Sequence, residues 1–300
     1  MDPRLVVLFG VLFTSQSSIY VRLSEAPALA IAANRMVIVS LLLLPFFFHE
    51  RLVERKKERY IPAKTLLLCV VSGLFLAVHF ATWIYSLEFT TIASATVIVN
   101  THPLFVVLLG FFLLRERITK RSLALLLVII AGSVLLSVGD VSVGRTALKG
   151  DLYSLVGAAT IACYMVVGRY VRRSLSARSY TFLVYSSSAA GLLLVAFVTG
   201  TRLFGYSYVE YLIFGALALF CTIFGHSLFN WALKYVKTAT LATLVLAEPI
   251  FATILGFIIF NELPPALTFA GASIMLVGLI LFVREEYNVK RAEPGAGTNQ

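Results

Sequence analysis

The sequence predicts an all-α integral membrane protein whose ten transmembrane helices form two inverted five-helix repeats, with both termini cytoplasmic. Three observations predict this fold. Hydrophobic residues make up 59% of the chain and charged residues 13%, whereas soluble globular proteins have roughly 45–50% and about 25%. Apolar runs of membrane-spanning length recur along the whole chain. A pattern in the first half returns in the second at a constant offset of 146 residues.

The apolar runs are long enough to cross a bilayer as helices, which takes about 17–25 residues. The first run begins after Arg4 and continues without a small-residue cleavage site, so we interpret it as a retained span and not as a signal peptide. Each of the three cysteines lies inside a run, without a CxxC pair, which favours a packing role. The ten runs cover residues 5–23, 28–48, 65–87, 92–114, 122–138, 152–171, 180–198, 208–233, 239–260 and 266–283.

The formal net charge of +10 is concentrated on one side of the predicted membrane. With the amino terminus in the cytoplasm, 20 of the 25 Lys and Arg residues fall at Arg4, in the loops after the second, fourth, sixth and eighth runs, and in the tail. The other side keeps Arg22, Arg145, Lys149 and Arg202. This asymmetry satisfies the positive-inside rule. Nucleic-acid binding is disfavoured because no loop is long enough for a folded basic domain, so the predicted large partner is the lipid bilayer.

The internal repeat relates residues 93–117 to residues 239–263 without a gap. Because each half holds five runs, the second half enters the membrane from the opposite side, and the repeat is inverted. Secondary transporters commonly use inverted repeats, with binding near the midplane and alternating access. We therefore predict a first repeat (1–138), an outer linker (139–151), a second repeat (152–283) and a cytoplasmic tail (284–300). The matching pairs are Pro103 with Pro249, Phe105 with Phe251, Leu109 with Leu255, Gly110 with Gly256, Phe111 with Phe257 and Glu116 with Glu262.

The doubled pattern of a Pro, a Gly seven residues later and a Glu thirteen residues after the Pro resembles the EamA-type transporters of the drug/metabolite transporter superfamily. The resemblance covers nearly the whole chain. It implies a ten-helix inverted-repeat fold and the movement of small metabolites, often amino acids or related compounds, outward from bacterial or archaeal cells. The first half departs from the pattern, because His102 precedes its Pro where Glu248 precedes the other.

Both repeat prolines lie inside apolar runs, where a Pro removes a backbone hydrogen bond. Pro103 and Pro249 are therefore candidate hinges, with static kinks as the alternative. His102 and Glu248 are equivalent under the 146-residue offset and lie near the predicted bilayer centre, where ionisable residues are costly and commonly functional. We predict a proton-coupling pair. The alternatives are a structural hydrogen-bonded pair and a glutamate that faces cytoplasmic water.

The third and eighth runs each carry a pair of side chains at i,i+4 spacing, which places them on one helix face. These pairs are His79 with Trp83 and His226 with Asn230, and the repeat relates the two histidines to within one residue. Such side chains combine an apolar body with a polar tip, which suits a cavity for a flat or amphipathic metabolite. The other predicted substrate-binding residues are Asn100, Tyr164 and Arg35.

Arg35 lies inside the second run, roughly 10 Å below its outer end. Its guanidinium could bind a carboxylate or phosphate as a bidentate fork. Alternatively, it snorkels outward or pairs with Glu25 or Glu88 as a structural cation.

Enzyme motifs are absent: no P-loop, dinucleotide fingerprint, HExxH or G-x-S-x-G occurs, so we predict no enzyme, cofactor or metal site. We predict a multi-pass transporter of the cell (inner or plasma) membrane that exports amino acids or related small metabolites, driven by an ion or substrate gradient. A carrier of phosphate-bearing metabolites or nucleotide sugars, a passive channel and a non-transporting assembly protein are the alternatives. Glycines seven residues apart on the fifth and tenth runs favour close helix packing, in a scaffold or a possible homodimer: Gly132 with Gly139, and Gly271 with Gly278.

Overall fold

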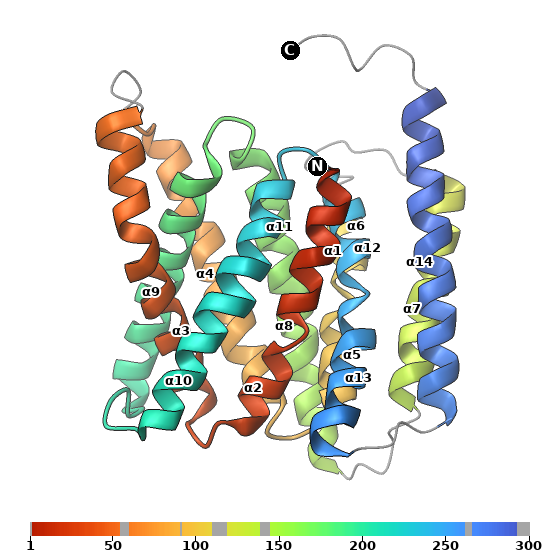
Figure 1. Cartoon of the computed structure of the whole chain (residues 1–300), viewed down its shortest axis with the longest axis horizontal. Helices are drawn as coiled ribbons and strands as arrows, with labels where there is room; N and C mark the ends of the chain where they lie inside the picture. The colour runs from red at the N-terminus through yellow and green to blue at the C-terminus, as the bar shows by residue number, and fades with distance from the viewer. Residues whose placement is uncertain are drawn as a thin grey trace.

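The structure is a computed structural model that describes residues 2–54, 60–90, 92–109, 119–138, 145–261 and 266–292. Within these residues all regular secondary structure is helical. The helices stand side by side, and the start of α1 (Pro3–Thr14) and the end of α14 (Ala266–Ala292) lie at the same end of the bundle (Figure 1). Five residues of the repeat and glycine patterns lie outside the described ranges, as do residues 293–300: Gly110, Phe111, Glu116, Gly139 and Glu262.

The described helices follow the predicted runs, and several runs are divided into two or three helical pieces. The first half contains α1, α2 (Ser17–Leu23), α3 (Ala28–His49), the π-helix η1 (Glu50–Glu54), α4 (Ala63–Ser86), α5 (Ile92–Val99), α6 (His102–Leu109) and α7 (Lys120–Val138). The second half contains α8 (Arg145–Val171), α9 (Ala177–Thr199), α10 (Tyr208–Ala216), the π-helix η4 (Leu217–His226), α11 (Ser227–Ala232), α12 (Thr238–Val245), α13 (Glu248–Phe260) and α14.

Seven helical segments are long and apolar enough to cross a membrane, among the residues that the structure describes. The runs predicted at 92–114, 122–138 and 266–283 correspond to α5 with α6, α7 and α14, which fall outside these seven. Two boundaries also differ from the predicted ones. α8 begins at Arg145, inside the predicted outer linker, and α14 continues to Ala292, past the predicted end of the tenth run.

Local sequence signals explain several helix ends. α3 and α4 begin directly after Pro27 and Pro62. The hydroxyls of Ser176 and Ser207 accept hydrogen bonds from backbone N–H groups in the first turns of α9 and α10, as N-cap serines commonly do. α9 ends at Gly200, whose φ of 67° is left-handed and favours glycine.

The contacts between helices are reciprocal between the two halves. α6 packs on α12 and α5 packs on α13, so the divided fourth and ninth runs lie antiparallel. α4 packs along α8, so the third run contacts the sixth. α1 packs on η4 and α11, so the eighth run contacts the first, which is the equivalent contact with the two halves interchanged. A twofold relation between the halves produces this kind of pairing.

Helices α7 and α14 pack against each other at the edge of the bundle, on the right in Figure 1. A Cβ atom added to Gly132 would lie 3.0 Å from the carbonyl oxygen of Gly271, and one added to Gly278 would lie 2.6 Å from Ile129. These glycines therefore serve the contact between α7 and α14 within one chain. A homodimer through these helices would use their outer apolar faces instead.

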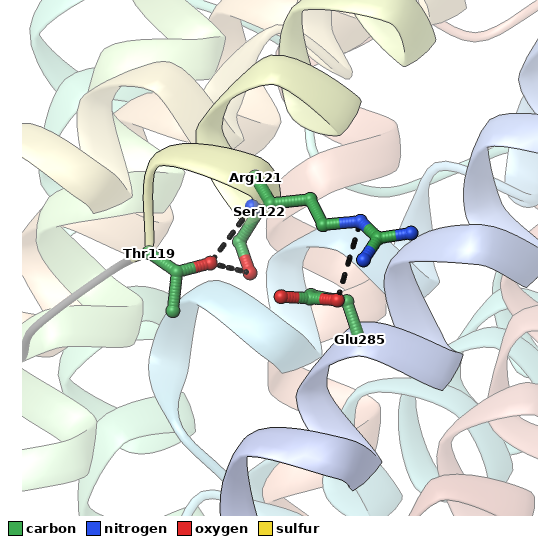
Figure 2. Close-up of polar contacts among 4 residues, drawn as sticks. All are labelled: Thr119, Arg121, Ser122 and Glu285. Carbon is green, nitrogen blue, oxygen red and sulfur yellow. Dashed lines mark hydrogen bonds and ion pairs between the residues drawn. The ribbon is translucent and has the colours of Figure 1, made fainter.

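Polar contacts support the same pair at one end (Figure 2). Figure 2 shows the Thr119 hydroxyl accepting a hydrogen bond from the backbone N–H of Ser122 at 3.0 Å, which caps the start of α7. Beside it, Arg121 Nε lies 3.4 Å from a carboxylate oxygen of Glu285 on α14. Because Arg121 is largely exposed, this ion pair adds little stability and mainly marks the register of the two helices.

Candidate functional site

A cavity lined mostly by buried residues lies between the two halves, and its volume is about 50 Å³. One water molecule needs roughly 10–15 Å³ on this scale, so the cavity holds a few waters, whereas pockets for drug-sized ligands measure roughly 300–1,000 Å³. A larger substrate therefore requires the halves to move apart. All nine residues predicted for substrate binding and proton coupling line this cavity: Arg35, His79, Trp83, Asn100, His102, Tyr164, His226, Asn230 and Glu248.

The fourth and ninth runs break next to the cavity. α6 begins at His102 and α13 begins at Glu248, each after a two-residue interruption, at positions equivalent under the 146-residue offset. Pro103 and Pro249 are thus the second residues of new helices, where a backbone N–H is not needed. The two prolines therefore stand at breaks between helices, and their role as hinges stays a prediction. Both prolines lie beside the cavity lining and do not belong to it.

His102 and Glu248 face the same cavity and bond to different partners. Glu248 Oε2 accepts a hydrogen bond from the Thr14 hydroxyl at 3.2 Å, and its place at the start of α13 lets the helix dipole stabilise negative charge. His102 Nδ1 donates to the carbonyl oxygen of Val99 at 3.2 Å. A neutral His102 ring then presents Nε2 as an acceptor, and this buried atom has no partner among the described residues.

Arg35 is completely buried and borders the cavity. Its Nε donates to the Thr222 hydroxyl at 2.7 Å, and its Nη1 donates to the Ser17 hydroxyl at 3.1 Å. The guanidinium carbon lies 4.2 Å from the centroid of the Phe80 ring, within cation–π range. Outward snorkelling and pairing with an acidic residue at the outer end, the two alternatives considered above, are therefore wrong.

The third and eighth runs bring their predicted pairs to the cavity from opposite sides. His79 Nδ1 donates to the carbonyl oxygen of Gly157 at 3.0 Å, and its ring lies parallel to that of Trp83 at 6.4 Å between centroids. His226 is the last residue of the ten-residue π-helix η4, and Asn230 lies on α11, which follows it. Because a π-helix holds more residues per turn than an α-helix, η4 can accommodate the one extra residue by which His226 departs from the 146-residue offset.

The predicted residues Tyr164 and Asn230 bind each other. The Tyr164 hydroxyl donates to Asn230 Oδ1, and Asn230 Nδ2 donates to the Tyr185 hydroxyl at 3.0 Å. Tyr185 in turn lies 3.2 Å from the Ser227 hydroxyl, and the backbone carbonyl of Asn230 accepts from Arg172 at 2.9 Å. Both residues thus shape the cavity wall through a network that connects α8, α9 and α11.

Two buried carboxylates join the halves at opposite ends of α3. Glu50, just after α3, accepts hydrogen bonds from the hydroxyls of Ser176 and Ser179 at 2.8 and 2.9 Å. Glu210 on α10 accepts from the Ser24 hydroxyl and from the next backbone N–H (2.8 Å), just before α3. Nothing in the local sequence distinguishes these two glutamates from exposed ones.

Sequence reasoning also missed Ser17, Phe80 and Thr222, the three residues that surround the Arg35 guanidinium. Weak signals exist for two of them. Ser17 belongs to a polar stretch in an otherwise apolar run, and Thr222 precedes His226 by four residues. Among the described residues, no group of three His, Cys, Asp or Glu side chains is placed to hold a metal ion.

Comparison with known proteins places both halves in one family. The profile of the EamA-like transporter family matches residues 4–138 and again residues 148–284. A solved crystal structure that is 18% identical in sequence superposes with a TM-score of 0.72, over 94% of this chain and 98% of that one. This likeness extends to the fold.

Several curated relatives are transporters. An uncharacterized transporter of Archaeoglobus fulgidus is 25% identical over 292 residues, which cover 95% of this chain and 98% of the relative. The pseudopaline exporter of Pseudomonas aeruginosa is 23% identical over 72% of this chain and 75% of its own length. The riboflavin transporter of Fusobacterium nucleatum is 26% identical over 71% of this chain and 70% of its own length.

Proposed function

This chain belongs to the EamA-like transporter family, and on that premise we propose that it exports small organic metabolites, amino acids or related compounds, by alternating access. It is a multi-pass membrane protein of a transporter family and not an enzyme. Export is the direction named for the related pseudopaline exporter. The driving force is an ion gradient or the gradient of the substrate itself.

The proposed topology has ten spans in two inverted five-helix repeats, with both termini in the cytoplasm of a plasma (inner) membrane. The antiparallel contacts of α5 with α13 and of α6 with α12 support the inversion. The common end reached by α1 and α14 supports an even number of crossings (Figure 1). The excess of Lys and Arg on that side supports its cytoplasmic assignment.

The observation that carries the proposal is the cavity between the halves, lined from both sides by the nine predicted residues. Alternating access needs a contact that opens at each end. The carboxylates of Glu50 and Glu210 make such contacts between the halves, at the two ends of α3. We propose that one of them separates in each open state.

A ligand screen followed by counterflow tests this function. The purified full chain is screened by thermal shift against amino acids, nucleobases and sugar phosphates. Compounds that raise the melting temperature are then offered as labelled substrates to proteoliposomes that hold the unlabelled compound. A carrier shows saturable counterflow, and a Trp83→Ala variant loses both the thermal shift and the flux. Flux that never saturates indicates a channel, and absence of flux for every stabilising compound contradicts the transport proposal.

We also propose that His102 and Glu248 couple proton movement to transport. Their equivalent places at the starts of α6 and α13, within one cavity, support this role. In proteoliposomes with an imposed proton gradient, Glu248→Gln and His102→Ala should each remove the gradient-driven part of the flux, because each substitution removes a titrating group. Counterflow without a gradient is the matched control. Gradient-driven flux that persists unchanged in both variants contradicts the coupling.

A carrier of phosphate-bearing metabolites or nucleotide sugars fits the cavity less well. Among the described residues that line it, Arg35 is the one Lys or Arg, whereas a dianionic phosphate favours several cations or hydrogen-bond donors. A homodimer through α7 and α14 also remains a proposal, and cross-linking in native membranes tests it.

A further inference from the structure

The guanidinium of Arg35 is held in place by protein contacts, and one of its nitrogen atoms is left without a hydrogen-bond partner among the described residues. Thr222 and Ser17 accept from Nε and Nη1, and Phe80 lies against one face. The remaining nitrogen, Nη2, is buried without a hydrogen-bond partner among the described residues. Buried polar groups are nearly always hydrogen-bonded, and leaving a charged one unpaired is costly. Because Arg35 borders the cavity, a ligand there can supply the missing acceptor.

The orientation of Arg35 depends on the π-helix η4. The Thr222 hydroxyl that receives Arg35 Nε itself donates to the carbonyl oxygen of Leu217, five residues earlier, at 3.0 Å. The five-residue separation is the π-helical one. The Thr222 hydroxyl is therefore held between a backbone acceptor and the guanidinium, and Thr222 is completely buried. This arrangement leaves the Thr222 lone pairs for Arg35 and fixes the orientation of the guanidinium.

Three other buried lining atoms also have no partner among the described residues, and their chemistry is determined. Trp83 Nε1 can only donate. Asn100 Nδ2 donates to the carbonyl oxygen of Thr96 at 2.7 Å, so Asn100 Oδ1 is left as an acceptor. His102 Nε2 is an acceptor in the neutral ring, for the reason given above. The donors lie on α3 and α4, and the acceptors lie at the break between α5 and α6.

The charge of the lining limits the ligand further. The ionisable lining side chains other than Tyr164 are one arginine, one glutamate and three histidines: Arg35, Glu248, His79, His102 and His226. Arg35 is the one Lys or Arg among the described lining residues, so the cavity offers a single cationic site for an anionic group. We infer that the cavity recognises a small monocarboxylate that also carries a hydrogen-bond donor. Arg35 Nη2 binds the carboxylate, and Asn100 Oδ1 and His102 Nε2 accept from the donor. Thr222 is the positioning residue for Arg35. This inference rests on the proposed transport function.

The test measures ligand selectivity with the fluorescence of Trp83. The chain has two tryptophans, and Trp231 does not line the cavity, so a Trp231→Phe background leaves one reporter at the site. The probes are L-alanine, L-valine and L-leucine, their amides, their N-acetyl derivatives, and methyl phosphate. The acids should bind roughly tenfold to a hundredfold more tightly than their amides, since a hydrogen bond to a charged group is lost. They should also bind more tightly than the N-acetyl derivatives, which keep one neutral amide N–H in place of the three ammonium donors.

Variants separate positioning from general structural damage. Arg35→Gln and Thr222→Val should remove the preference for acid over amide and leave the preference for amine over N-acetyl unchanged. Thr222→Ser, which keeps the hydroxyl, should restore the first preference. Thr181→Val is the matched control, because the buried Thr181 hydroxyl bonds within its own helix and lies outside the cavity. Asn100→Leu should weaken the preference for the amine over the N-acetyl derivative and leave the preference for acid over amide unchanged.

Several results would overturn the inference. Equal binding of acids and amides to the Trp231→Phe protein would contradict a carboxylate site. Tighter binding of methyl phosphate than of the acids would indicate a phosphate site instead. An unchanged acid preference in Thr222→Val removes the positioning role. If Arg35→Gln does not fold, the comparison of acids with amides and the two Thr222 variants still test the inference. Counterflow of some other compound, with no binding by any probe acid, overturns this inference and leaves the proposed transport function standing.

Discussion

A methyl group added at Gly73 is predicted to separate α4 from α9 and to disturb the cavity wall. A Cβ atom at Gly73 would lie 2.5 Å from Ser187 Cβ and 2.6 Å from the carbonyl oxygen of Val184. Favourable contacts between carbon atoms need about 3.5 Å, so the helices must move apart by roughly 1 Å. Overpacking of this kind costs about 1–3 kcal/mol, and the helix preference for Ala over Gly returns up to about 1 kcal/mol. We expect Gly73→Ala to lower the free energy of unfolding by about 1–2 kcal/mol.

Two glycines provide graded controls for this prediction. A Cβ at Gly191, on the same interface, would meet the flexible end of Leu74 at 3.0 Å, and a Cβ at Gly215 would meet nothing within 4 Å. The order of stability should therefore be Gly215→Ala above Gly191→Ala above Gly73→Ala, measured by denaturant unfolding in matched detergent micelles. Because α4 also carries His79 and Trp83, only Gly73→Ala should reduce counterflow strongly. Equal stability of all three variants would refute the close approach of α4 and α9.

Three further predictions concern single contacts. Glu210→Gln should speed hydrogen exchange at residues 24–26, because an amide NH₂ replaces one acceptor oxygen and a buried charge-assisted bond is worth about 1.5–3 kcal/mol. Unchanged exchange at these residues would contradict the contact. Gly200→Ala should cost about 1 kcal/mol in unfolding free energy, since its φ of 67° strains any residue with a Cβ, and a neutral result would mean that α9 ends differently. Tyr185→Phe should cost about 1–3 kcal/mol by leaving Asn230 Nδ2 without its acceptor; thermal melting of the purified variant measures the loss, and wild-type stability would exclude that bond.

Periodicity and the repeat carried much of the prediction. The apolar runs are visible in the order of the residues, because a bilayer requires long apolar helices, and seven described helical segments have the length and hydropathy of a span. The 146-residue offset predicted that His102 and Glu248 occupy equivalent places, and the i,i+4 spacing put His79 with Trp83 on one helix face. All four line the cavity, although their roles in binding and coupling stay predictions. The helix break at each proline was not predicted, since a Pro at the second position of a new helix and a Pro in a kinked helix look alike in sequence.

The amino-acid sequence by itself thus determined the membrane class, the family and the list of polar side chains inside the spans, since these depend on residue type and local spacing. Tertiary structure decided which of those side chains meet. Arg35 with Thr222, Tyr164 with Asn230, and Glu50 with Ser176 are each separated by dozens of residues or more in the chain. Their contacts depend on helix rotation, and the place of Thr222 depends also on the π-helix η4. Local spacing specifies neither, because both result from how whole helices pack.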